Sequence, residues 1–114
     1  MIDHQLDAEL LEELARYRAD RNTLDMWPGE QLDLLAECGV MADVIPRSHG
    51  GEGVAPDLLL ARYTALAEAD LETTFVLTQR NGACQRIAAS DNEDLKRAVL
   101  PGLAQGEQFA TVGI

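Results

Sequence analysis

A stretch of proline and glycine near the middle of the chain separates segments that otherwise follow a helical pattern. It reads Ile45-Pro46-Arg47-Ser48-His49-Gly50-Gly51-Glu52-Gly53. Proline and clustered glycines interrupt regular structure, so residues 39–55 are predicted to form an irregular, turn-rich link. Aromatic residues make up only 4% of the chain, which leaves aliphatic side chains to fill the core. We therefore expect an all-α protein, an irregular bundle of about five helices built around this link.

The positions of these helices follow from apolar spacing and punctuation. The first is expected over residues 4–22, where Leu6, Leu10, Leu14 and Tyr17 share one face and acidic and basic side chains occupy the other. Three more are expected over residues 31–38, 56–70 and 71–89. A fifth, short helix is expected to begin within the segment 90–93 and to end near Leu100.

Helix-capping residues support the later boundaries. Asp70 is predicted to cap the helix over residues 71–89, with Thr73 three positions on. Residues 90–93, Ser-Asp-Asn-Glu, match a complete capping box for the fifth helix. Pro101 is expected to break that helix, and Gly106 to end the turn that follows.

The last seven residues, 108–114, have the composition of a β-strand. No other segment of the chain is an evident partner, and a lone strand leaves its backbone groups without hydrogen bonds. We therefore expect residues 1–107 to be a helical domain. Residues 108–114 are expected to be the first strand of a β-domain that is otherwise absent from the chain.

The charge of the chain excludes several classes of function. The net charge is −11, so nucleic acid and anionic lipid surfaces would be repelled. No apolar run approaches membrane-spanning length, and the first residues are polar, unlike a signal peptide. Cys38 and Cys84 lie in apolar helical segments, where free cysteine behaves as a small hydrophobe. A cytoplasmic protein with reduced cysteines is the expectation.

The glycine cluster and the histidines indicate no catalytic chemistry. A phosphate cradle needs a helix that starts directly after the last glycine, whereas Pro56 stands apart from Gly53 and Glu52 adds a negative charge. His4 and His49 have no carboxylate at a recognisable ligand spacing, so no metal is expected. Neither Ser48-His49 nor the cysteines form a recognisable nucleophile set, and we expect no catalytic residue in this chain.

The helix over residues 71–89 is unusual because its middle is polar, Thr78-Gln79-Arg80-Asn81-Gly82. Helical spacing places Phe75, Gln79, Gly82 and Arg86 on one face. A glycine inside a helix costs about 0.5–1 kcal/mol relative to alanine, and usually serves the close approach of another group. Two interpretations stay open: a polar face turned to water, or one wall of a site.

The order and spacing of two motifs carry a family resemblance. They are the Ile45–Gly53 stretch and the later Lys96–Pro101 followed by Gly106-Glu107. With two apolar helical segments between them, they resemble the N-terminal helical domain of the acyl-CoA dehydrogenase family. The resemblance extends from about Trp27 to Ile114, and more loosely over the first helix.

The resemblance implies a function and a set of partners. It implies part of an FAD-dependent oxidoreductase that introduces an α,β double bond into an acyl-CoA or related thioester, in a homodimer or homotetramer. The flavin-binding residues of the β-domain and the catalytic glutamate would lie outside this chain, which alone is expected to be inactive. Aligned on the family, Thr78, Gln79 and Gly82 fall near the far end of the acyl pocket.

One departure from the family bears on the substrate. A plain fatty chain favours an apolar wall, because an unpaired buried amide costs about 1–3 kcal/mol. Gln79, Arg80 and Asn81 would suit a polar or carboxylated acyl group better, or could meet a neighbouring subunit. Two alternative functions stay open: a flavin monooxygenase or nitroalkane-oxidase-like enzyme of the same fold, and a standalone acidic helical module that binds a protein partner.

Overall fold

The computed structural model describes residues 8–20 and 27–112, with five α-helices. Two single-turn 3-10 helices, η1 (Val40–Ala42) and η2 (Arg47–His49), lie in the link after the second helix. The five α-helices are α1 (Ala8–Asp20), α2 (Gly29–Glu37), α3 (Pro56–Ala69), α4 (Leu71–Ala89) and α5 (Glu93–Gln105). The expected all-α class is confirmed. The expected ends of the first helix, residues 4–7 and 21–22, lie outside the described residues.

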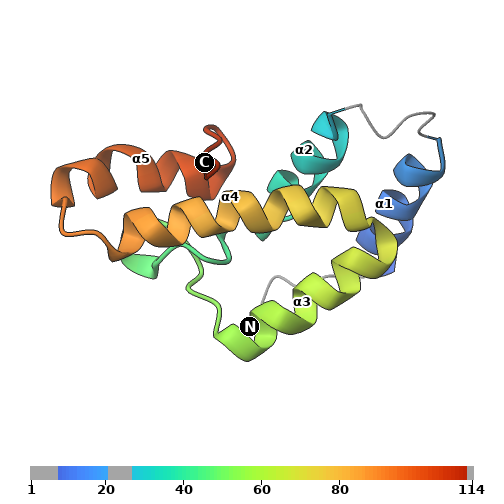
Figure 1. Ribbon diagram of the computed structural model, residues 1–114, viewed down its shortest axis with the longest axis horizontal. Helices are drawn as coiled ribbons and strands as arrows, with labels where there is room; N and C mark the ends of the chain where they lie inside the picture. Colours follow the sequence, from blue (N-terminus) through green and yellow to red (C-terminus); the bar gives the residue numbers. More distant parts are fainter. Residues whose placement is uncertain (1–7, 21–26, 113–114) are drawn as a thin grey trace.

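The longest helix, α4, is the axis of the fold (Figure 1). It packs against α3 and α2 near its first half and against α5 near its second half, while α1 packs against α3 and α2. The predicted cap holds α4 in place, because Asp70 accepts hydrogen bonds from the Thr73 backbone N–H at 3.1 Å and the Thr73 hydroxyl at 2.7 Å. The chain thus turns sharply between α3 and α4.

The core consists of two hydrophobic clusters that α4 connects. The first lies among α1, α2, η1, α3 and the start of α4, and the second lies between the end of α4, α5 and residue 45. Leu77 belongs to the first cluster and Cys84 to the second. Arg80 and Asn81 lie on α4 between these two positions, so a polar section of the helix joins the two halves of the core.

The glycine-rich link is irregular, as predicted, and it folds back on itself. The backbone N–H groups of residues 49–54 all donate hydrogen bonds to carbonyls of residues 42–47. A Cβ atom on Gly51 would lie 1.9 Å from the Ile45 carbonyl oxygen, so this residue must be glycine for the link to close. Gly50 and Gly53 have φ of +90° and +57°, a backbone conformation that glycine adopts at no steric cost.

The fifth helix differs from the prediction at both ends. Asn92, not Ser90, is its N-cap, since the Asn92 side chain accepts a hydrogen bond from the Leu95 backbone N–H at 3.0 Å. Pro101 does not break the helix, which continues to Gln105. Proline removes one backbone donor. Continuing the helix buries Leu103 and Ala104 in the second cluster, and this burial outweighs the lost hydrogen bond.

The segment after α5 runs beside α2 and α4 (Figure 1). Residues 109–112 have no regular secondary structure, and residues 113–114 lie outside the described range, so the expected strand over 108–114 stays a prediction. Within the described ranges, no helix is both long enough and apolar enough to cross a membrane.

Candidate functional site

The residues in the polar middle section of α4 lie on two different faces of the helix. Arg80 and Asn81 are buried, whereas Gln79 is exposed and Thr78 and Gly82 are half-buried. The predicted face through positions 75, 79, 82 and 86 is therefore the outward face. The structure brings the three predicted pocket residues, Thr78, Gln79 and Gly82, together on this side of the helix.

The outward face is apolar at its beginning and polar further along. Leu71 and Phe75 are each 63% exposed, although both are large hydrophobic residues. One turn later comes the exposed Gln79. The Thr78 hydroxyl donates a hydrogen bond to the Phe75 carbonyl oxygen at 2.7 Å, so this hydroxyl cannot also donate to a ligand. This face therefore presents the exposed Phe75 ring, followed one turn later by the exposed amide of Gln79.

The tail after α5 limits this face at Gly82. A Cβ atom built on Gly82 would lie 3.9 Å from Val112 Cγ2, at ordinary van der Waals distance. Val112, the last described residue of the tail, thus lies beside α4 at Gly82, but an alanine would also fit there, so this contact does not explain the glycine. Arg86, the next exposed residue on the face, lies one turn after Gly82.

Arg80 is the centre of a buried polar network on the opposite face. Its Nη1 donates to the Met41 carbonyl oxygen at 2.7 Å and to Asn81 Oδ1 at 2.8 Å, and its Nη2 donates to the Leu103 carbonyl oxygen. Its Nε has no hydrogen-bond partner among the described residues. Asn81 Nδ2 in turn donates to the Tyr63 hydroxyl oxygen at 2.7 Å.

These contacts correct part of the sequence interpretation. Arg80 and Asn81 were expected to face a polar or carboxylated acyl group, or a neighbouring subunit, together with Gln79. Both side chains instead bind η1, α3 and α5 inside the core. The physical reason is helical geometry: each residue advances by 100°, so residues adjacent in sequence diverge to different faces.

Burial sets the protonation of the groups around Arg80. Burial raises the pKa of the Tyr63 hydroxyl, an effect that the hydrogen bond from Asn81 partly opposes. Burial also raises the pKa of the Cys84 thiol, against the opposing charge of Arg80. Burial lowers the pKa of Arg80, but a guanidinium remains charged in proteins. Cys84 is therefore a neutral thiol inside the core, not an activated nucleophile.

A buried ion pair fastens the glycine-rich link to α3. Arg62 Nη1 lies 3.0 Å from each carboxylate oxygen of Asp43, and both residues are buried. Removing one partner of such a pair leaves the other charge buried alone, so the pair resists separation. It fixes the position of residues 42–47, whose carbonyls close the link.

The link does not fit a phosphate or a flavin diphosphate. An anion cradle needs several free backbone N–H groups, and those of residues 49–54 are all bound to carbonyls. The exposed Glu52 adds a negative charge to the same loop. The residues of this link thus supply no site for the FAD that the family resemblance implies, as the sequence predicted for the glycine cluster.

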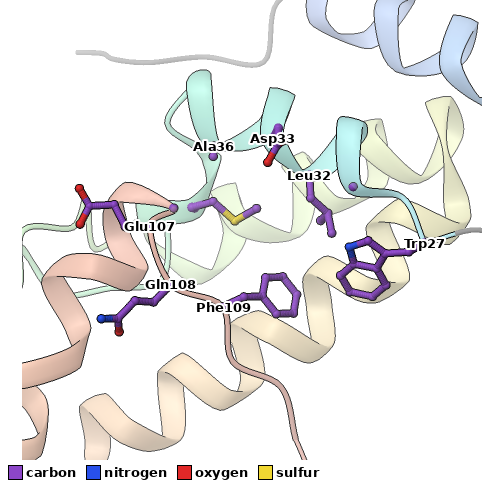
Figure 2. Close-up of a pocket in the computed structure, with 10 residues that line it drawn as sticks. Trp27, Leu32, Asp33, Ala36, Glu107, Gln108 and Phe109 are labelled. Atoms are coloured by element: carbon purple, nitrogen blue, oxygen red, sulfur yellow. The ribbon is translucent and has the colours of Figure 1, made fainter.

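A half-open groove of about 300 Å³ lies between α2 and the tail (Figure 2). The rings of Trp27 and Phe109 meet edge to face across one end, with centroids 5.6 Å apart and planes at 82°. Leu32 and Met41 are buried residues of its lining. Sequence reasoning missed this groove; the only signal was the presence of two aromatic residues in a chain that has few.

The described residues contain no group of three or more His, Cys, Asp or Glu side chains that could hold a metal ion. Ser48 Oγ lies 3.1 Å from His49 Nδ1, but the two residues are sequence neighbours on an exposed turn. Among the described residues, no hydrogen bond joins His49 to a buried carboxylate, which a hydrolytic triad requires.

Comparison with known proteins identifies the family of this chain. A family model described as "Acyl-CoA dehydrogenase, N-terminal domain" matches residues 1–107 of the 114 residues. No curated protein matches the chain. The match covers all five helices, including the glycine-rich link and the outward face of α4. The chain therefore belongs to the acyl-CoA dehydrogenase family, through its N-terminal domain.

Proposed function

We propose that this domain forms one wall of the acyl-binding pocket in an FAD-dependent, acyl-CoA dehydrogenase-like oxidoreductase. The wall is the outward face of α4, with Thr78, Gln79 and Gly82 as its central residues. The substrate is an acyl-CoA or a related thioester, in which the enzyme creates an α,β double bond. The active protein is a longer chain that assembles as a homo-oligomer and works in the cytoplasm.

The observation that carries this proposal is the exposed face itself. Large apolar side chains such as Leu71 and Phe75 are seldom left together in water, because each loses about 1.5–3 kcal/mol of burial free energy. About two turns after Phe75, the half-buried Gly82 lies on the same face, beside Val112 of the tail. A surface of this kind, in a domain of this family, fits the side of a ligand pocket.

The side chains on this face indicate which part of the reaction this domain performs. Its side chains are a phenyl ring, an amide and a hydroxyl that is already bound within the helix. None of them is a base at neutral pH, so the domain binds and orients the acyl chain. Removal of the α-proton belongs to a carboxylate elsewhere in the enzyme, and a bound flavin would supply the hydride acceptor.

The test is made on the complete protein that contains this domain, purified with its cofactor. We expect a flavin absorbance spectrum and bleaching of that spectrum on addition of acyl-CoA under anaerobic conditions. The products should be 2-enoyl thioesters. A protein without flavin, or a flavin that no thioester reduces, would contradict the proposal.

The same experiment separates the alternative chemistries. A monooxygenase or nitroalkane-oxidase-like enzyme would keep the flavin spectrum but would consume oxygen with a different substrate and form no enoyl thioester. A protein-binding module of 12.4 kDa would carry no flavin at all.

A further inference from the structure

We propose that the acyl group bound at this wall has an apolar body and one uncharged hydrogen-bonding group, contacted by Phe75 and Gln79 respectively, and that it carries no carboxylate. This inference rests on the proposed function, because it assigns a substrate class to the same wall. It narrows the choice between polar and carboxylated acyl groups that the sequence left open.

Gln79 is the one exposed amide on the central part of the wall. Its neighbour Asn81, also an amide, is buried and bound to Arg80 and Tyr63. The Thr78 hydroxyl already donates its hydrogen bond to the Phe75 carbonyl oxygen. Gln79 therefore supplies both a donor and an acceptor to a ligand, which matches a hydroxyl or a carbonyl group.

The charges near the wall disfavour a carboxylate. Arg80, the closest cation in sequence, is 0% exposed on the opposite face and already bound to two main-chain carbonyls. Arg86 lies seven residues after Gln79, about 10 Å along the helix axis, and one turn after Gly82, where Val112 lies beside the helix. A carboxylate beside Gln79 would lack a cationic partner from α4 and would face a chain of net charge −11.

The apolar part of the ligand has its own surface on the same face. Phe75 precedes Gln79 by about one turn, and Leu71 precedes Phe75 by about another. Leu71 and Phe75 are therefore about 6 Å apart along the helix axis, and Gln79 lies about 6 Å further on. The side chains of Leu71 and Phe75 are both 63% exposed. An acyl chain that lies along α4 thus meets hydrocarbon first and the amide afterwards.

The test compares three CoA thioesters of equal chain length on the complete, flavin-bound enzyme. One has an unsubstituted chain, one a terminal hydroxyl and one a terminal carboxylate. We expect the hydroxyacyl thioester to have a higher kcat/KM than the carboxyacyl one. Gln79→Leu should raise the ratio of unsubstituted to hydroxyacyl kcat/KM about tenfold, the effect of one hydrogen bond of about 1.4 kcal/mol.

Gln85→Leu is the matched control. Gln85 is also an exposed glutamine on α4, but it points about 120° away from Gln79 around the helix. This variant should leave the ratio unchanged. Equilibrium binding of the three thioesters, followed by the flavin spectrum, should shift in the same direction as kcat/KM, because the amide acts on binding.

The possible outcomes separate the two proposals. If the carboxyacyl thioester is the best substrate, or if Gln79→Leu changes the ratio no more than Gln85→Leu does, the substrate class is wrong while the proposed function stands. If the enzyme binds flavin but neither binds nor oxidises any of the thioesters, the proposed function fails, and the substrate class fails with it.

Discussion

The two faces of α4 use similar residues for opposite purposes. On the inward face, Arg80 and Asn81 are buried and bound to main-chain and side-chain partners from three other elements. On the outward face, Gln79 and Phe75 are exposed, and no hydrogen bond within the described residues involves the Gln79 side chain. Polar residues in a helix are therefore no guide to a site until their partners are known. A satisfied polar group stabilises the fold, whereas an unsatisfied one remains available to a ligand.

The comparison predicts that the inward face determines stability. Arg80→Met should lower the free energy of unfolding of the 114-residue chain by about 3 kcal/mol, because the Met41 and Leu103 carbonyls and the Asn81 amide lose their donor inside the core. Urea unfolding followed by circular dichroism measures this loss. Arg86→Met, at an exposed arginine of the same helix, should change it by less than about 0.5 kcal/mol. Equal effects of the two variants would remove the distinction between the faces.

The hydrogen bond between Tyr63 and Asn81 should have a smaller effect. Tyr63→Phe leaves the buried Asn81 Nδ2 without its acceptor, at an expected cost of about 1–2 kcal/mol at pH 7. Urea unfolding of the variant beside the original chain measures this cost. No loss of stability would mean that Asn81 finds another acceptor.

The same tyrosine predicts a pH dependence. Burial raises the pKa of Tyr63 above its ordinary value of 10.0 in the folded state. Its stabilising contribution is therefore fully present below pH 10, where the folded and unfolded states both keep the proton. Above pH 10 the unfolded state ionises first, so stability falls as the pH rises towards the folded pKa. The stability difference between the original chain and Tyr63→Phe should narrow above pH 10. A constant difference would contradict the raised pKa that partial burial gives this hydroxyl.

A change on the outward face should stabilise the chain slightly. Gly82→Ala adds a Cβ that would meet Val112 Cγ2 at 3.9 Å without a clash, and alanine favours the helix by about 0.5–1 kcal/mol. Thermal unfolding should show a raised Tm. A lowered Tm would mean that the tail lies closer to the helix than this contact distance.

The smallest effect is expected at Gln79. Because its amide is exposed, Gln79→Leu should change the free energy of unfolding by less than about 0.5 kcal/mol, even though it is expected to alter substrate preference. The urea unfolding used for Arg80→Met provides the measurement. A large loss of stability would show that Gln79 belongs to the folded core.

Predictions that depended on local patterns were largely correct. The bounds expected for α3 and α4, residues 56–70 and 71–89, agree closely with the observed Pro56–Ala69 and Leu71–Ala89. Asp70 caps α4 as its spacing from Thr73 indicated. Helix periodicity and capping involve residues within four positions of one another, so a sequence contains the information needed to recognise them.

Predictions that depended on distant contacts were less successful. The sequence indicated that Pro101 ends α5, but burial of Leu103 against residues from α4 and the link carries the helix past it. The contact between Trp27 and Phe109 joins residues 82 positions apart, and no sequence pattern predicted it. The grouping of Arg80 and Asn81 with Gln79 was wrong because their partners lie on η1, α3 and α5.

The sequence by itself determined the helical class, the position of the glycine-rich link, most helix boundaries and the family resemblance, since these depend on composition, short-range spacing and the order of motifs. Only the tertiary structure decided which polar residues of α4 form hydrogen bonds inside the core and which stay exposed to a ligand. The physical reason is that a hydrogen bond to Met41 or Leu103 requires segments that folding brings together from about 40 and 20 residues away. Whether a polar side chain is free to bind a ligand therefore depends on how the chain packs. Arg80 and Asn81 face the core, whereas Gln79, on another face of the same helix, stays exposed.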